Sequence, residues 1–222
     1  MTARHGWREV AYGLGSYAAY LVVRRRVFRR DGERRALRNA QRIADIENRW
    51  HLGIEQPLQR AAMRFPRLVD ICNAGYAAGN VTLSVGWLMV LHRRDHDTYR
   101  RERNAALAAF LMSLPVFLRY PTAPPRALDG YVDTLALRGV PLDHPLLVRF
   151  YNPIAAMPSQ HIAFAVVSGV GLAARARSPW RRAGWRSYPA AIALVVLATG
   201  NHFVADVVAG AGVGALARAA TR

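Results

Sequence analysis

Two short stretches of the chain decide its fold, residues 152–161 (NPIAAMPSQH) and residues 200–206 (GNHFVAD). His161 and His202 each open an apolar run of helical length. Ionisable side chains are costly beside long apolar helices, so a histidine at the start of each run indicates a functional position. The two stretches therefore predict two apolar helices whose first residues belong to one reactive site.

Outward from these stretches, apolar runs alternate with clusters of arginine along the chain. Six apolar runs are separated by polar segments: residues 10–23, 68–91, 105–118, 161–174, 188–199 and 202–217. No segment shows a convincing strand pattern, in which apolar and polar residues alternate. The sequence predicts an all-α fold, a polytopic membrane bundle of about six transmembrane helices.

The first two runs differ in how well they fit a membrane. Residues 68–91 form the clearest span, with one acid, Asp70, near its edge. Residues 10–23 make a helix of only about 21 Å, against ~30 Å of hydrocarbon. This first run either spans with the help of its flanks and snorkelling arginines, or lies at the interface.

The chain divides into two segments of one domain. Residues 1–67 hold the first apolar run and an arginine-rich amphipathic segment, and residues 68–222 hold the transmembrane bundle with both histidines. Residues 36–63 place apolar side chains at mixed helical spacing. They form either an amphipathic helix on the membrane surface or a solvated helix that packs on the bundle.

The chain is strongly basic, which limits its partners. Its net charge is +17, and all 31 basic residues are arginine. Such a charge suits nucleic acid or an anionic membrane surface. A nucleic-acid-binding domain has no need of several long apolar helices, so we expect membrane lipids as partners and no nucleic acid. Cys72 stands alone and forms no intramolecular disulfide.

The arginines also bear on orientation. The short loops 91–104 and 174–187 carry five arginines each, which places them on the cytoplasmic face by the positive-inside rule. The starts of the two histidine helices then face outward. Residues 24–67, with 13 arginines, oppose this assignment, although long segments weigh less in the rule.

The histidines and their neighbours suggest phosphoryl chemistry. Asp206 follows His202 by four residues, so the two share one helix face, and a carboxylate on one imidazole nitrogen leaves the other free to attack. Ser159 is placed to cap the helix that His161 opens, helix N-termini bind phosphate, and a histidine there can act as a general acid. The alternative is an ordinary pair of capped helices.

Residues 119–126 (RYPTAPPR) form a third element, which carries two arginines. Arg119 and Arg126 can clamp phosphate oxygens through bidentate hydrogen bonds. The alternative is a proline-rich connector with snorkelling arginines.

These motifs together resemble the type 2 phosphatidic acid phosphatase (PAP2) superfamily, and within it the inositolphosphotransferase (Aur1/Ipt1-like) branch. The resemblance is carried by residues 120–126 (YPTAPPR), 130–134 (GYVDT), 155–161 (AAMPSQH) and 199–206 (TGNHFVAD). It implies an integral membrane enzyme of the bacterial plasma membrane that cleaves a phospholipid or prenyl phosphate.

The resemblance also implies a role for each site residue. His202 is the nucleophile that becomes a phosphohistidine, Asp206 orients it, and His161 protonates the leaving group. Ser159 contacts the phosphate and Arg126 clamps it, while no metal and no cofactor take part. Water as acceptor gives a phosphatase, whereas inositol or a lipid hydroxyl gives a transferase.

The chain departs from the superfamily at two cationic elements. A Lys-x6-Arg-Pro element is missing, because Met112 stands seven residues before Arg119 and tyrosine follows it. Val195 and Val196 stand where the superfamily has Ser-Arg before the nucleophile. The missing charge must come from Arg126, Arg119, Arg149 or elsewhere.

Two other functions remain possible from the sequence. One is a non-catalytic membrane protein of PAP2 fold that binds lipid headgroups, and the other is a haloperoxidase-like relative. The sequence makes no prediction of oligomeric state.

Other polar residues receive weaker interpretations. Residues 92–97 hold two histidines and two aspartates, which we interpret as a solvated loop. His144 in the outer loop touches a headgroup or is a plain loop residue. Glu47 and Glu55 either contact a headgroup or pair with Arg42 and Arg60.

Overall fold

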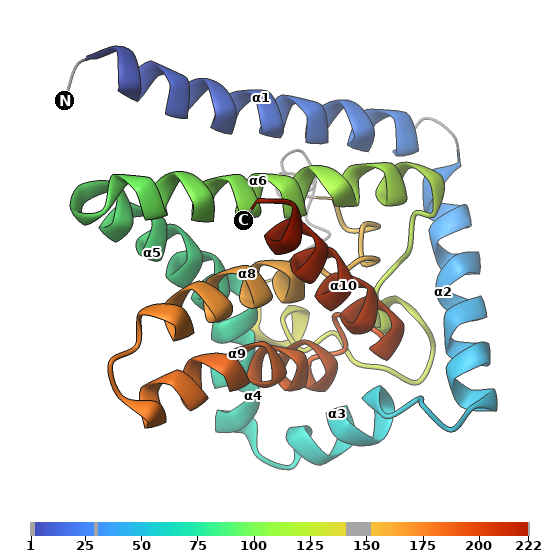
Figure 1. The fold of residues 1–222 in the computed structure, drawn as a ribbon. Helices are drawn as coiled ribbons and strands as arrows, with labels where there is room; N and C mark the ends of the chain where they lie inside the picture. Colours follow the sequence, from blue (N-terminus) through green and yellow to red (C-terminus); the bar gives the residue numbers. More distant parts are fainter. Residues whose placement is uncertain (1–2, 29–30, 141–151, 222) are drawn as a thin grey trace.

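The computed structural model describes residues 3–28, 31–140 and 152–221, and these ranges are helical with no named strand. Figure 1 shows a helix bundle. The long N-terminal helix lies over the other helices, and the next helix in the chain runs along one edge of the bundle. The main helices are α1 (Ala3–Phe28), α2 (Gly32–Arg49), α3 (Glu55–Met63), α4 (Pro66–Ala74), α5 (Asn80–Arg94), α6 (His96–Arg119), α8 (Gln160–Arg175), α9 (Pro179–Ala198) and α10 (Val204–Ala220). The prediction of an all-α fold is confirmed.

Helix α8 lies at the centre of the bundle and contacts α5, α6, α9 and α10. Small residues bring these helices close together. A Cβ atom added at Gly214 of α10 would lie 2.7 Å from the backbone oxygen of Ala163, and one at Gly169 of α8 would lie 2.8 Å from that of Trp185. The close approach of α8 to its neighbours places the starts of α8 and α10 side by side.

One helix in the described ranges is long and apolar enough to cross a membrane. It runs from Pro66 to Arg94, with mean hydropathy 1.3 and 17% of its apolar window buried. It joins α4 and α5 through a π-helical turn, Gly75–Gly79. This element contains the predicted span 68–91, but the prediction of about six spans is not confirmed.

The other described helices fall short of the length or the apolar composition of a membrane span for identifiable reasons. Helices α8 and α10 have 16 and 17 residues, short of the roughly 20 that a bilayer core requires. Helices α6 and α9 begin with polar turns rich in arginine, and α1 carries Arg24, Arg25 and Arg26 near its end. Helix α1 is longer than its predicted apolar run because the polar flanks are helical too.

The predicted amphipathic segment 36–63 is two helices rather than one. Helix α2 ends at Arg49, and the chain turns through His51, whose φ of 57° is left-handed, before α3 begins at Glu55. Ala36, Ala40 and Ile43 of α2 are buried against the bundle. This segment therefore packs on the bundle, as one interpretation expected, and its contact with a membrane surface stays a prediction.

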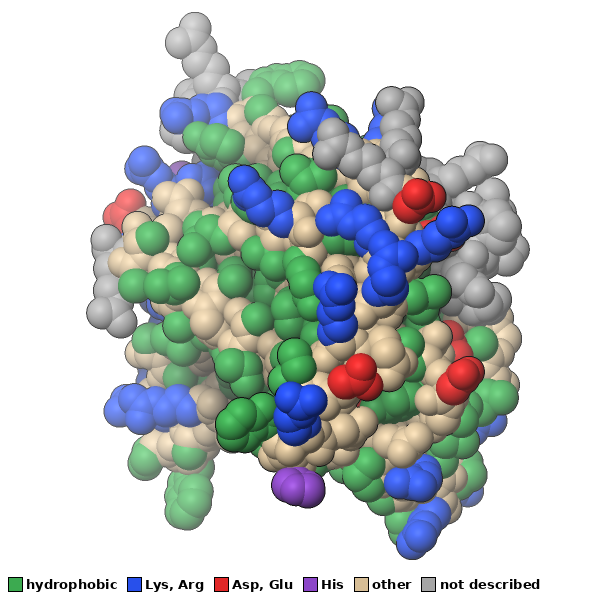
Figure 2. Space-filling model, turned by 90° about the vertical axis from the view of Figure 1, so that its right-hand side faces the viewer, with side chains coloured by type: hydrophobic (Ala, Val, Ile, Leu, Met, Phe, Trp, Pro, Cys, Tyr) green, Lys and Arg blue, Asp and Glu red, His purple; other side chains and the backbone are tan. Residues whose placement is uncertain are grey.

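The outer face of α2 is basic. Arg34, Arg38, Arg42 and Arg49 are exposed on it, and Figure 2 shows arginine side chains spread among apolar ones on this side of the molecule. Such a mixture suits the surface of an anionic membrane.

Candidate active site

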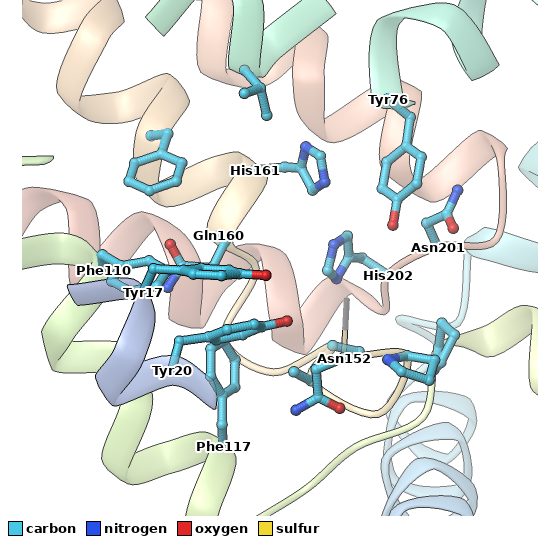
Figure 3. Close-up of a pocket in the computed structure, with 16 residues that line it drawn as sticks. Tyr17, Tyr20, Tyr76, Phe110, Phe117, Asn152, Gln160, His161, Asn201 and His202 are labelled. Carbon is cyan, nitrogen blue, oxygen red and sulfur yellow. The ribbon is translucent and has the colours of Figure 1, made fainter. Parts of the chain in front are cut away.

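The two predicted histidines face each other. His161 is the second residue of α8, and His202 comes two residues before the start of α10. Their ring centroids lie 6.0 Å apart at an interplanar angle of 62°. Figure 3 shows both rings at the wall of one cavity. A phosphoryl group held in this cavity would have an imidazole available on two sides.

Asp206 fixes the His202 ring. Its Oδ2 lies 3.3 Å from Nδ1 of His202 and accepts the backbone N–H of Phe203 at 2.9 Å. Asp206 is fully buried, so water does not compete for these bonds. With Nδ1 held by a carboxylate, the second ring nitrogen, Nε2, is the one that carries a lone pair for chemistry.

Ser159 caps α8, as predicted. Its Oγ accepts the backbone N–H of Ile162 at 3.4 Å, and its own N–H donates to the backbone oxygen of Asp206 at 3.0 Å. Ser159 is fully buried and is not among the residues that line the cavity. In this structure Ser159 joins the starts of α8 and α10, and so fixes the positions of the two histidine segments relative to each other.

The two predicted clamp arginines differ in position. Arg126 has a largely buried side chain, forms an ion pair with Asp133 at 3.0 Å and donates to the side chain of Asn201. Its backbone N–H also donates to Gly200 at 2.9 Å, which ties it to the loop that carries His202. Arg119 is exposed, and the only hydrogen bond described for it is at its backbone oxygen, which accepts from Arg35. Arg126 therefore lies beside the site, whereas nothing in the described contacts brings Arg119 to it.

The structure places uncharged side chains at the positions where the superfamily has cationic ones. Val196 is fully buried in an apolar cluster, and Met112 is exposed on α6. No arginine is among the described residues that line the cavity. Arg149 and His144 lie outside the described residues.

The cavity in front of the histidines has a volume of about 500 Å³, within the range of small-molecule sites. Its wall is mostly apolar and aromatic. The described lining residues are Tyr17, Tyr20, Tyr76, Val81, Phe110, Phe117, Pro124, Asn152, Pro153, Ala155, Ala156, Gln160, His161, Phe164, Asn201 and His202.

Several residues of the site were not predicted from the sequence. The Tyr76 ring centroid lies 4.4 Å from that of His161 and 6.5 Å from that of His202. Asn80 donates to the backbone oxygen of His161 at 2.8 Å and accepts from Tyr188 at 2.8 Å. Tyr76 and Asn80 belong to an apolar run in which no local signal marks them. Asn201 adjoins the predicted nucleophile, and its position in the motif could have identified it.

Two buried carboxyl groups accept backbone N–H groups at the start of α10. Glu47 accepts the backbone N–H of Ala205, and Glu55 accepts that of Val204, each at 2.7 Å. Both side chains are almost completely buried, and burial together with the nearby Glu55 carboxyl group raises the pKa of Glu47. The expectation that these acids contact a headgroup or pair with Arg42 and Arg60 is therefore wrong, because they complete the N-terminus of α10 instead.

The prediction of a solvated loop at residues 92–97 is wrong, because α5 ends at Arg94, α6 begins at His96 and Asp95 between them is the N-cap of α6. Asp95 accepts the backbone N–H of Thr98 at 3.0 Å and forms an ion pair with Arg175 at 2.7 Å. These hydrogen bonds to Thr98, followed by the Arg175 charge, lower the pKa of Asp95. Among the described residues, no group of three or more histidine, cysteine or acidic side chains is placed to hold a metal.

Comparison with known protein families gives a match over most of the chain. The family model PAP2_3, described as PAP2 superfamily, matches residues 41–220, which include every predicted site residue and leave out α1. Neither the curated proteins nor the solved structures yield a match to this chain.

Proposed function

The chain belongs to the PAP2 superfamily, and from that premise we propose that it is an integral membrane lipid phosphatase or phosphotransferase. The observation that supports this most is the placement of His202, with a buried carboxylate on Nδ1, 6.0 Å from His161 at the wall of an apolar cavity. The superfamily includes phosphatases and phosphotransferases, and both begin by the same step.

In the first step, Nε2 of His202 attacks phosphorus and the bond between phosphorus and the lipid oxygen breaks. His161 takes up a proton from the phosphate monoester as it binds and passes this proton to that oxygen, so that the lipid leaves as an alcohol. Asp206 stabilises the positive charge that develops on the His202 ring. The product of this half-reaction is a phosphohistidine at His202 and a neutral His161.

In the second step, an acceptor hydroxyl attacks the phosphohistidine. His161 takes the proton of the acceptor, the nitrogen–phosphorus bond breaks, and His202 returns to its starting state. Water as acceptor releases phosphate, and an alcohol such as inositol or a lipid hydroxyl gives a new phosphate monoester. Both acceptors are compatible with this geometry.

Phosphate charge requires a partner near His202. We assign this role to Arg126, because its guanidinium donates to Asn201 and Asn201 lines the cavity. Arg126 is held by Asp133 on its other side, which pre-organises it. Ser159 supports the phosphate site through the start of α8, whose dipole favours an anion.

The substrate is proposed to be a phospholipid or a prenyl phosphate. An apolar cavity next to the histidines suits a hydrocarbon chain, and the helix Pro66–Arg94 suits a membrane. We place the chain in the bacterial plasma membrane with the histidines on the outer side, following the arginine loops. The proposed reaction uses no metal, so activity should survive EDTA.

The test is phosphate release from a panel of lipid mono- and diphosphates by wild type, His202→Ala and the control His51→Ala. His51 is an exposed histidine outside the site. We expect the wild type and His51→Ala to release phosphate, and His202→Ala to lose at least about a hundredfold in kcat. Turnover by folded His202→Ala above a few percent of wild type would remove His202 as the nucleophile. If no protein releases phosphate, the same lipids are tested with inositol as acceptor.

A further inference from the structure

Helix α1 lies outside the matched range 41–220, yet two of its side chains line the cavity that holds the histidines. Tyr17 and Tyr20 form one wall of this cavity, on the side opposite Tyr76 (Figure 3). Helix α1 reaches this position because it packs along α6. The site is therefore completed by a segment for which the family match makes no prediction.

The α1 wall is a continuous aromatic surface. The rings of Tyr17 and Tyr20 stack at 5.9 Å with an interplanar angle of 22°, and Tyr20 lies 5.9 Å from Phe110 of α6. Both tyrosines direct their hydroxyl groups toward the side of the cavity that His202 occupies (Figure 3). Polar atoms thus gather at the histidine end of the wall, and apolar ring faces lie away from it, as an amphiphilic ligand requires.

A second cavity continues this wall away from the histidines. It has a volume of about 260 Å³ and shares Tyr17, Phe110 and Phe164 with the first cavity. Its other lining residues are Gly13, Ser16, Leu88, Arg103, Ala106 and Leu107. Apart from Leu88 of α5, these positions precede Tyr17 on α1 and Phe110 on α6, so the second cavity extends toward the beginnings of both helices.

The second cavity is not an anion site, although Arg103 lines it. The Arg103 guanidinium is paired with Glu9 and stacks over the Tyr12 ring at 4.8 Å. Its charge is compensated by these partners, and the remaining lining is almost entirely apolar. The chemistry of the second cavity therefore matches a hydrocarbon chain rather than a phosphate or a sugar.

We infer that α1 is part of the substrate site and forms the path along which the hydrocarbon chain of the substrate lies. The phosphate lies between His161 and His202, the first part of the chain lies on Tyr17, Tyr20 and Phe110, and the chain end enters the second cavity beside Gly13. This inference rests on the proposed function, because it names the substrate of the same site. A short chain ends in the first cavity, whereas a long one needs both.

Gly13 gives a direct way to test the chain path. A Cβ atom at Gly13 would meet nothing within 4 Å, so Gly13→Leu fits on α1 and places its side chain at the second cavity. Gly15→Leu is the matched control, because a Cβ there also meets nothing within 4 Å and Gly15 lines neither cavity. Both changes replace a glycine within α1 by leucine, so their effects on helix stability should be similar.

The experiment measures kcat/KM for alkyl phosphates from hexyl to hexadecyl phosphate in detergent micelles, with wild type and both variants. We expect Gly13→Leu to lower the ratio of hexadecyl to hexyl phosphate turnover by about tenfold, since a hydrophobic pocket discriminates by added or missing methylenes. Gly15→Leu should keep the wild-type ratio. Equal ratios in the two variants, or an equal loss on both substrates in Gly13→Leu, would overturn the inference.

A binding measurement separates this inference from the proposed reaction. Stabilisation of the folded protein by each alkyl phosphate, measured as a shift in Tm, needs no turnover. If the wild type hydrolyses no alkyl phosphate but the Tm shift still grows with chain length in wild type and Gly15→Leu and not in Gly13→Leu, the chain path stands and the proposed reaction fails. A Tm shift with the same chain-length dependence in all three proteins would reject the chain path alone.

Discussion

The Glu55 carboxylate accepts the backbone N–H of Val204 at 2.7 Å, across 149 residues of chain. Glu47 makes the matching bond to Ala205. Val204 comes two residues after the proposed nucleophile, so the two acids position the turn from which His202 enters the cavity. Their bonds satisfy two N–H groups that the first turn of α10 leaves without a partner inside the helix.

Replacing Glu55 by alanine should destabilise the fold. The change leaves the N–H of Val204 buried without its acceptor, which costs about 1–3 kcal/mol. Glu55→Gln keeps an oxygen at the same position and should lose less. Chemical unfolding of both variants measures the difference, and equal stability of Glu55→Ala and wild type would show that the Val204 bond contributes nothing.

The Glu47 carboxyl group should make stability fall as the pH rises. Burial, together with the nearby Glu55 carboxyl group, raises the pKa of Glu47 from 4.5 to about 8. Between these two values the folded chain holds a proton that the unfolded chain has released, so raising the pH favours unfolding. We expect the Tm to decline from about pH 4.5 to about pH 8 in wild type.

Glu47→Gln should flatten this decline, because a neutral amide replaces the carboxyl group that must keep its proton. Glu33→Gln is the matched control, since Glu33 is an exposed acid on the same helix. A Tm that declines as steeply in Glu47→Gln as in Glu33→Gln would contradict the role of Glu47.

Asp206→Asn should lower kcat strongly while the protein stays folded. The amide oxygen can keep both hydrogen bonds of Oδ2, to the N–H of Phe203 and to Nδ1 of His202. A neutral amide does not stabilise the positive charge that develops on the His202 ring. The loss in kcat should reach about a thousandfold or more, as expected for a triad-like carboxylate. Steady-state kinetics with a circular dichroism control measures this, and a kcat within about tenfold of wild type would mean that Asp206 acts only as a cap.

Much of the site was predictable because it lies in short local motifs. The spacing of His202 and Asp206 fixes their contact within one helical turn, and the Ser159 cap follows from the same local rules. The all-α fold followed from apolar runs that lack any strand pattern. For these features the relevant interactions span only a few residues of sequence.

The features that could not be predicted from the sequence depend on contacts between segments that are far apart in the chain. Tyr17 and Tyr20 enter the cavity because α1 packs along α6, and Glu47 reaches Ala205 because α2 packs against α10. No periodicity in residues 1–67 predicts either contact. The number of spans stays a prediction, because the apolar runs other than 68–91 have only 12 to 16 residues, whereas ~20 are needed to cross the bilayer core.

His161 as the general acid predicts a dependence on the leaving group. Alkyl alcohols are poor leaving groups and need a proton as the bond to phosphorus breaks, whereas a nitrophenolate leaves without one. His161→Ala should therefore lose about a hundredfold or more in kcat on an alkyl phosphate but far less on nitrophenyl phosphate. Neither substrate should be turned over by His202→Ala. Single-turnover rates of phosphohistidine formation with the two substrates measure this difference, and an equal loss on both would assign His161 to a role other than proton donation.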